Sequence, residues 1–147
     1  MVGDPPVAGP PASPPAPAVD SDPVVPRGPS GPLPVLAATV ADAVVRVDVR
    51  GTALAELGGV ARATVELRGL HRFLLLTRST AASVVALNGT CTHDGCTVAH
   101  FVAPHFECGC HGSRFEWSGR VVRGLAAAAL PRLEAQLDGA IVTVILR

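Results

Sequence analysis

The sequence predicts an all-β fold, arranged as an antiparallel sandwich or barrel. From about residue 35 onward, short apolar runs recur, and several of them alternate apolar and polar positions with a period of two. Turn-forming pairs such as Asn88-Gly89 and Asp138-Gly139 follow these runs. Period-two alternation is typical of half-buried strands, and many short strands with frequent turns favour an antiparallel sandwich or barrel.

The predicted elements follow one another with few interruptions. In chain order they are strands over 45–49 and 62–67 with a helical turn over 52–57 between them, apolar strands over 73–76 and 84–87, and a hairpin of 133–137 and 141–146. The helical turn is expected to end at Gly58-Gly59, and the Asp138-Gly139 pair predicts the tight turn of the final hairpin.

Residues 1–36 differ in composition from the rest of the chain. Twelve of the fourteen prolines lie between Pro5 and Pro34. Because proline fixes φ and lacks an N–H, neither a helix nor a central strand is expected there. We therefore expect residues 1–36 to be a disordered or polyproline-II segment and residues 37–147 to form the folded domain. Such a segment serves either as an inert tail or as a tether to another protein.

Composition and charge exclude two classes of protein. Twelve basic and twelve acidic residues give a formal net charge of zero, which argues against nucleic-acid binding. No apolar run reaches the roughly eighteen residues of a membrane span, so none is predicted in this chain. The hydrophobic fraction of 48% supplies a core, and because aromatic residues make up only 3%, that core must consist mainly of Val, Leu and Ala.

Residues 88–124 contain all four cysteines and four of the five histidines. They form two elements, Cys91-Thr92-His93-Asp94-Gly95-Cys96 and Cys108-Gly109-Cys110-His111-Gly112-Ser113. Three interpretations are open: a structural zinc site, two disulfides, or an iron-sulfur cluster in which two His replace two Cys. Zinc fingers usually pair like ligands, and two disulfides leave the repeated Cys–His spacing unexplained. The iron-sulfur interpretation is therefore favoured.

The two elements closely resemble the paired boxes of Rieske proteins, Cys-x-His-x-Gly-Cys and Cys-x-Cys-His-Gly-Ser. The likeness extends through Gly119-Arg120-Val121, Gly124 and Leu130-Pro131, and covers roughly residues 37–147. It implies an antiparallel β-sandwich of Rieske type with a cluster-binding loop subdomain at about 88–124. It also implies one 2Fe-2S cluster, with Cys91 and Cys108 on the buried iron and His93 and His111 on the outer iron.

The resemblance further implies a disulfide. Respiratory and photosynthetic members, such as the Rieske subunits of cytochrome bc1 and b6f complexes, join the additional cysteine of each box, as do arsenite-oxidase small subunits. The matching residues here are Cys96 and Cys110. On the chain-entropy model, closing a loop of this length stabilises the fold by about 3 kcal/mol. Many Rieske ferredoxins and oxygenases lack this bridge, so the resemblance is to the disulfide-bearing branch.

Four positions in or near the two boxes bear on the reduction potential of the cluster. Ser113 matches a family serine that donates to a bridging sulfide, whereas Phe115 stands where high-potential members carry a tyrosine that donates to a cysteine sulfur. Asp94 replaces a leucine that packs into the quinol pocket of a partner; a carboxylate opposes such burial and favours cationic imidazole. Gly124 is retained in the loop that covers the cluster, although Leu125 replaces its usual proline. We expect a potential between those of disulfide-free ferredoxins and of quinol-oxidising members.

The remaining histidines and aromatic residues of this region receive simpler interpretations. His100 and His105 match no ligand position and are interpreted as loop histidines. Phe101, Phe106, Phe115 and Trp117 are expected to pack around the cluster as a small core rather than to form a partner surface.

Taken together, these features predict one-electron transfer without independent turnover of an organic substrate. The expected partner is a cytochrome or an oxidoreductase subunit, with quinol oxidation as one reaction of such a complex. The alternative is a free soluble carrier. The N-terminus lacks the basic start and apolar run of a secretory signal, yet a disulfide favours an oxidising compartment. Of the two possible locations, we expect the protein to lie on the extracytoplasmic side.

Overall fold

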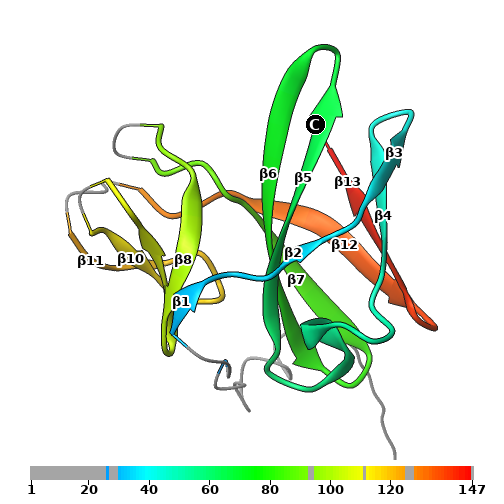
Figure 1. The fold of residues 1–147 in the computed structure, drawn as a ribbon, viewed down its shortest axis with the longest axis horizontal. Helices are drawn as coiled ribbons and strands as arrows, with labels where there is room; N and C mark the ends of the chain where they lie inside the picture. The colour runs from blue at the N-terminus through cyan, green and yellow to red at the C-terminus, as the bar shows by residue number, and fades with distance from the viewer. Residues whose placement is uncertain (1–25, 27–29, 93–94, 111, 125–127, 147) are drawn as a thin grey trace, which may run out of the picture.

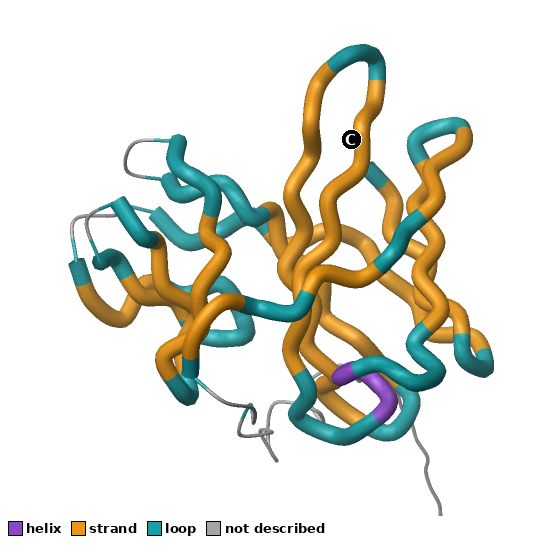
Figure 2. The backbone as a smooth tube through the Cα atoms, in the orientation of Figure 1, coloured by secondary structure: helices purple, strands orange, loops and turns teal. Residues whose placement is uncertain are grey.

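The computed structural model describes Pro26 and residues 30–92, 95–110, 112–124 and 128–146. In this part of the chain, strands make up two sheets, and the only helix is a short 3-10 turn (Figures 1 and 2). The elements are β1 (Gly31–Pro32), β2 (Val35–Leu36), β3 (Thr39–Ala41), β4 (Val44–Asp48), the 3-10 helix η1 (Ala53–Ala55), β5 (Val60–Leu67), β6 (Leu70–Thr80), β7 (Ser83–Asn88), β8 (Val98–Val102), β9 (His105–Cys108), β10 (Arg114–Phe115), β11 (Val121–Arg123), β12 (Arg132–Asp138) and β13 (Ile141–Ile145). The all-β prediction is confirmed.

The larger sheet has eight strands in the order β2-β5-β6-β7-β12-β13-β4-β3. Its neighbouring strands pair antiparallel, except that β2 lies parallel to β5. The two longest strands, β5 and β6, form a hairpin that extends beyond the rest of the sheet (Figure 1). The sequence-predicted hairpin at the C-terminus is present as β12 and β13, paired from Asp138 with Ile141 to Glu134 with Ile145.

The first core lies inside the larger sheet and consists of small and branched aliphatic side chains. On β4, Val45 and Val47 are buried while Arg46 and Asp48 face solvent, as the alternation predicts. On β5, Ala61, Ala63 and Val65 are buried in the same way. The other members include residues of β6, β7 and β13, among them Leu74, Leu76, Ala86, Val142 and Val144.

The predicted helical turn is present as η1. The backbone N–H of Leu54 donates to Thr52 Oγ1 at 3.1 Å, which caps the N-terminus of this turn. Leu54 is fully buried and joins the first core. The turn ends at Glu56, and a Cβ placed on Gly59 would come within 1.8 Å of the Ala53 carbonyl oxygen. Gly59 therefore allows the chain to pass close to the turn before β5 begins.

The smaller sheet has five strands in the order β1-β8-β9-β10-β11 and lies beside the larger one (Figure 1). A second core fills the space between the two sheets. It contains the three buried phenylalanines Phe101, Phe106 and Phe115, together with Cys91 and Cys108. Leu75 and Leu87, from the central strands β6 and β7 of the larger sheet, contribute to it from the other side. The smaller sheet is thus anchored to the larger one through the core that holds two of the candidate ligands.

Residues 31–36, which the composition assigns to the linker, contain two short edge strands. Gly31–Pro32 pair with β8 at the edge of the smaller sheet, and Val35–Leu36 pair with β5 at the edge of the larger sheet. The N–H of Leu33 donates to Ala99 O at 2.9 Å, and Pro34 O accepts from Arg62 N at 2.9 Å. Prolines are compatible with these positions because an edge strand has a neighbour on one side only. The rest of the predicted linker lies outside the described residues, apart from Pro26 and Ser30.

Segment 30–36 joins the two sheets. Leu33, which is 3% exposed, belongs to the second core, whereas Leu36 belongs to the first. In Figure 1 this segment runs from the smaller sheet to the larger one. Among the described residues, none forms a helix with the length and hydropathy that a membrane crossing requires.

Candidate iron-sulfur site

The first candidate loop connects β7 to β8 and carries Cys91. The N–H of Cys91 donates to Cys96 O at 2.6 Å, and the N–H of Gly95 donates back to Cys91 O at 3.0 Å. At the base of the loop, Thr90 and Thr97 form a β-bridge. Gly95 has φ +80°, a left-handed conformation in which glycine is the least strained residue. The chain thus makes a tight turn that leaves Cys91 at its start, only 4% exposed.

The second loop, between β9 and β10, repeats this backbone pattern. The N–H of Cys108 donates to Ser113 O at 2.8 Å, and the N–H of Gly112 donates back to Cys108 O at 3.0 Å. Gly112 has φ +76°, close to the value at Gly95. The two loops therefore present a cysteine at the same place in the same turn, and Cys108 is as deeply buried as Cys91, at 1% exposure.

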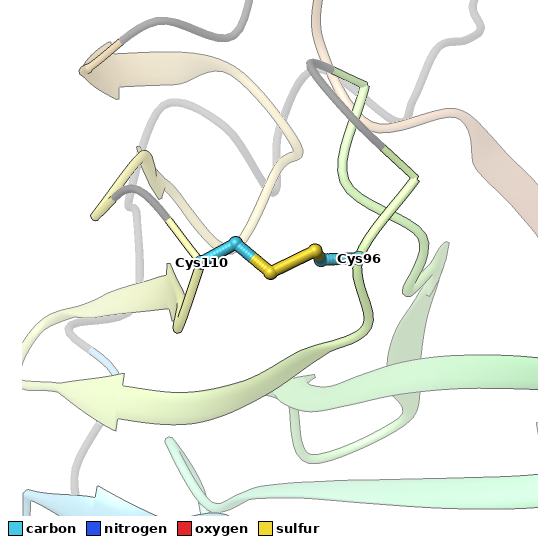
Figure 3. The surroundings of a disulfide bond; sticks show 2 residues. All are labelled: Cys96 and Cys110. Carbon is cyan, nitrogen blue, oxygen red and sulfur yellow. A yellow bond between two sulfur atoms is a disulfide. The ribbon is translucent and has the colours of Figure 1, made fainter.

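A disulfide between Cys96 and Cys110 ties the two loops together, fourteen residues apart in sequence (Figure 3). The pairing implied by the family resemblance is therefore present. The Cys108 sulfur lies within 4.8 Å of both disulfide sulfurs. Because Cys96 and Cys110 are bonded to each other, they have no thiolate to offer a metal. Cys91 and Cys108 form no disulfide and keep their thiols.

Gly124 and Ala128, which we call the third segment, contact the two loops. Gly124 lies against Ser113 of the second loop, and a Cβ placed on it would come 2.6 Å from Ser113 Cα. On the other side, Thr92 Oγ1 donates to Ala128 O at 2.5 Å. This contact with the first loop was not predicted from the sequence. The only signal for it is a hydroxyl residue directly after a ligand cysteine, which does not reveal a partner thirty-six residues away.

Buried aromatic rings lie beneath the loops. Phe101 and Phe106 meet edge to face, with ring centroids 5.9 Å apart, and Phe115 has no exposed surface. Trp117 packs against the same core and is partly exposed. The aromatic residues therefore form the small core that the sequence predicts. They exclude water from the buried side of the site.

His100 and His105 lie in strands β8 and β9, not in loops as expected. A Cβ placed on Gly109 would meet His100 Nδ1 at 3.6 Å, so the His100 ring lies over the second loop. Strands β8 and β9 have only five and four residues and are joined by Ala103-Pro104, so neither shows an alternation long enough to predict a strand. Three of the candidate residues, His93, Asp94 and His111, lie outside the described residues, as does Leu125.

Two ion pairs lie on the smaller sheet near the site. Arg114 Nε meets Glu107 Oε2 at 3.2 Å across β9 and β10. Glu116 accepts hydrogen bonds from Arg120 Nη2 at 2.5 Å and from Ser118 Oγ at 3.2 Å. The hydrogen bond from Arg120 holds the pKa of Glu116 below its ordinary value of 4.5. The first pair joins two paired strands, and the second spans the turn from β10 to β11.

The site fits a cluster that takes two thiolates from the protein. The two remaining thiols are buried in equivalent turns, and the disulfide fixes those turns to each other. The Ser113 side chain, which has no exposed surface, lies in the second loop beside Gly124. Two buried thiolates are the softest ligands that a protein supplies to iron in such clusters.

Comparison with known proteins agrees with this chemistry. A family model described as the Rieske [2Fe-2S] domain matches residues 42–134. The iron-sulfur subunit of the chloroplast cytochrome b6-f complex of Volvox carteri is 40% identical over 76 residues, which cover 50% of this chain and 37% of that protein. The corresponding Synechococcus subunit is 36% identical over 74 residues, which cover 50% of this chain and 42% of that protein.

A relative of a different kind is the carotenoid phi-ring synthase of Chlorobaculum tepidum, 36% identical over 107 residues, which cover 68% of this chain and 16% of that protein. The chain thus spans less than half the length of each of these curated relatives. Among solved structures, the plasma membrane Rieske protein of Synechocystis PCC 6803 is 29% identical with a TM-score of 0.45, over 55% of this chain and 82% of that one. The chain belongs to the Rieske [2Fe-2S] domain family, and it holds a 2Fe-2S cluster of the Rieske type.

Proposed function

We propose that this chain is a redox subunit of an oxidoreductase complex and that Cys91, His93, Cys108 and His111 hold its cluster. The observation that carries the ligand assignment is the pair of equivalent turns, each of which buries one thiol. His93 and His111 follow those cysteines in the two boxes. When bound, a 2Fe-2S cluster with two Cys and two His ligands takes up and releases one electron at a potential of roughly −150 to +300 mV.

The protein's own residues would tune and protect this site. Cys91 and Cys108 supply two buried negative charges, and the phenylalanine core below them keeps water away from the sulfur side. Phe115 is buried and has no hydroxyl. A ligand sulfur therefore receives one hydrogen bond fewer than in high-potential relatives, which carry a tyrosine at the matching position. Together with the carboxylate of Asp94, this supports a potential below that of quinol-oxidising members and above that of disulfide-free ferredoxins.

Membership of a complex is supported by the relatives and by the disulfide. Two of the relatives are named as subunits of the cytochrome b6-f complex, and in the carotenoid phi-ring synthase the matched region is a small part of a much longer chain. In each of these proteins the matched domain therefore belongs to something larger. The proposed partner is a cytochrome or another oxidoreductase subunit. A free soluble carrier is the alternative.

We further propose that the proline-rich residues before Ser30 act as a tether and that the Rieske domain begins at Ser30. The composition supports a stiff spacer of up to about 3 Å per residue. The disulfide supports a location on the extracytoplasmic side, because reducing compartments disfavour such bonds.

Purification of the native protein with its spectrum recorded throughout tests the proposal. We expect a red-brown species whose reduced form gives the EPR signal of a mixed Cys–His 2Fe-2S cluster, and which elutes together with other redox proteins. A colourless zinc protein would contradict the ligand assignment. A coloured protein that elutes alone at about 15 kDa from native extract would favour the free carrier. Replacing His93 or His111 with Ala should abolish the signal, whereas His105→Ala should leave it unchanged.

A further inference from the structure

Strand β6 has an unpaired edge close to the cluster site. Its pairing with β7 ends where Leu74 meets Asn88, and the last backbone contact on that side is the bond from Gly89 N to Phe73 O, at 2.7 Å. Beyond this point, Leu70–Phe73 pair with β5 only, since no described strand lies along their other side. Backbone groups alternate in direction along a strand, so the N–H and C=O of His71 point to the same open edge as the Phe73 carbonyl.

A groove of about 280 Å³ lies at this edge. Residues from both faces of β6 line it, because Phe73 and His71 project to one face while Arg72 and Leu74 project to the other. Leu133 and Leu146 close its far side. This volume is slightly smaller than that of typical small-molecule pockets, which is about 300–1,000 Å³. Its position beside unpaired backbone groups suits a short extended segment better than a compact ligand.

The groove carries positive charge and exposed apolar surface. The Arg72 side chain has no hydrogen bond or ion pair with any residue that the structure describes, and none of the described residues that line the groove is acidic. The His71 ring stacks on Phe73, with ring centroids 6.4 Å apart. Leu70 also lines the groove and is 63% exposed. Only three large apolar side chains among the described residues are exposed to this degree or nearly so. Glu66 lies opposite His71 on β5, on the side away from the groove's open edge.

The groove is continuous with the first ligand loop. Asn88 and Thr90 line its inner end, and Cys91 follows directly. Asn88 Oδ1 accepts from Thr90 N at 3.0 Å, which fixes the turn between groove and loop. A segment bound here would therefore lie beside the site through which electrons pass.

We propose that this groove binds an extended acidic segment of the redox partner, which adds to β6 as a further strand. Its backbone would pair with the N–H and C=O of His71, one of its carboxylates would meet Arg72, and an apolar side chain would cover Leu70. The inference rests on the proposed function in that the segment belongs to the protein that exchanges electrons with the cluster. The hairpin β5–β6, which extends beyond the rest of the sheet, is then part of the docking surface (Figure 1).

The test is an NMR titration of the oxidised, cluster-loaded protein with a blocked peptide of alternating glutamate and valine. We expect saturable shifts of the His71 and Phe73 backbone amides. Two matched peptides separate the contributions: one with lysine in place of glutamate, and one with N-methylated valines that cannot donate backbone hydrogen bonds. Both should bind at least about tenfold more weakly, since a charge-assisted or strand-type contact is lost.

Two protein variants locate the contact. Arg72→Gln should weaken binding of the glutamate peptide about tenfold, whereas Arg68→Gln, in the exposed turn of the same hairpin, should change it less than about twofold. Absence of saturation, equal binding of the lysine or N-methylated peptide, or shifts that map elsewhere would overturn the proposal. The EPR signal of the same sample is read independently. Loss of a Rieske signal contradicts the proposed ligands, whereas an intact signal without peptide binding contradicts only the docking site.

Discussion

Gly124 lies directly against Ser113, so that a Cβ on Gly124 would come 2.6 Å from Ser113 Cα and 2.8 Å from its Oγ. Gly124 also has φ +100°, which side-chain-bearing residues rarely adopt. The third segment can approach the second ligand loop this closely only because residue 124 has no side chain. Ser113 in turn has no exposed surface and cannot move aside into solvent.

Gly124→Ala is therefore expected to destabilise the cluster site. Left-handed backbone at a non-glycine residue costs about 1–2 kcal/mol, and the clash with Ser113 adds about 1–3 kcal/mol. The free energy of unfolding should fall by at least about 2 kcal/mol, and the visible absorption of the cluster should bleach faster in chelator. Gly139→Ala is the matched control, since Gly139 has φ +63° but nothing within 4 Å of the added Cβ. Equal effects of the two substitutions would contradict the role of the close approach.

Removal of the disulfide should weaken the link between the two ligand loops. The double variant Cys96→Ser, Cys110→Ser leaves a fourteen-residue separation unconstrained in the unfolded chain. We expect the free energy of unfolding to fall by about 3 kcal/mol. Urea unfolding, followed through the cluster absorption, measures this loss. Wild-type protein treated with a thiol reductant serves as the control and should behave like the double variant. An unchanged unfolding midpoint would show that the bridge is not a stabilising constraint.

Phe115→Tyr should raise the reduction potential. The family resemblance places a hydroxyl at this position within reach of a ligand sulfur, and a hydrogen bond to a charged group contributes about 1.5 kcal/mol. For a one-electron couple, this corresponds to about 60 mV. Phe106→Tyr is the matched control, because Phe106 is equally buried in the same core but does not hold the matching position. A redox titration in which both variants shift alike would refute the assignment of residue 115.

Thr92→Val should loosen the third segment from the first loop. The substitution removes the hydrogen bond from Thr92 Oγ1 to Ala128 O while keeping the side-chain shape. The expected cost is about 1 kcal/mol, seen as faster amide hydrogen exchange around residue 128 and faster cluster loss in chelator. Thr143→Val in β13 provides the comparison, because the Thr143 side chain forms no hydrogen bond with any described residue. Unchanged exchange rates near Ala128 would show that this hydrogen bond does not hold Ala128 against the first loop.

Acidification should remove the contribution of Glu116 to the stability of the fold. Its pKa is lower in the folded state than its ordinary 4.5, chiefly because Arg120 donates a hydrogen bond to it. A lowered folded-state pKa stabilises the fold above about pH 4.5, and this contribution is lost as the pH falls through the folded-state value. Glu116→Gln should therefore lower stability slightly at pH 7, and the difference between the two proteins should shrink as the pH falls below about 4.5. Melting curves of both proteins between pH 3 and 7 measure the difference.

The exposed pair of Asp48 and Arg50 provides a comparison on the larger sheet. Hydrogen bonds from Arg50 lower the Asp48 pKa from 3.8 to about 2. The contribution of ionised Asp48 to stability should accordingly persist to lower pH than that of an ordinary aspartate. Salt should screen this contribution, because both groups face solvent. If added salt left the effect of Asp48→Asn unchanged, the pair would not be acting as a surface ion pair.

The sequence alone determined the fold class and, through its resemblance to Rieske proteins, the disulfide and the type of cofactor. Strands such as β4 were predictable because burial of alternate valines is a local property of a pleated chain. The final hairpin was predictable because Asp138-Gly139 is itself a turn signal. The cofactor followed from six Cys and His residues whose spacing is local within each box, so no long-range contact had to be inferred.

Only the tertiary structure decided which distant segments meet. Proline content predicted a linker through residue 36, yet Leu33 and Leu36 are buried in the two cores, because an edge strand needs hydrogen bonds on one side only. The contacts between Thr92 and Ala128 and between Gly124 and Ser113 likewise join residues that share no local pattern. Periodicity describes which face of a strand is buried. It carries no information on what lies against that face, which packing of the whole chain determines.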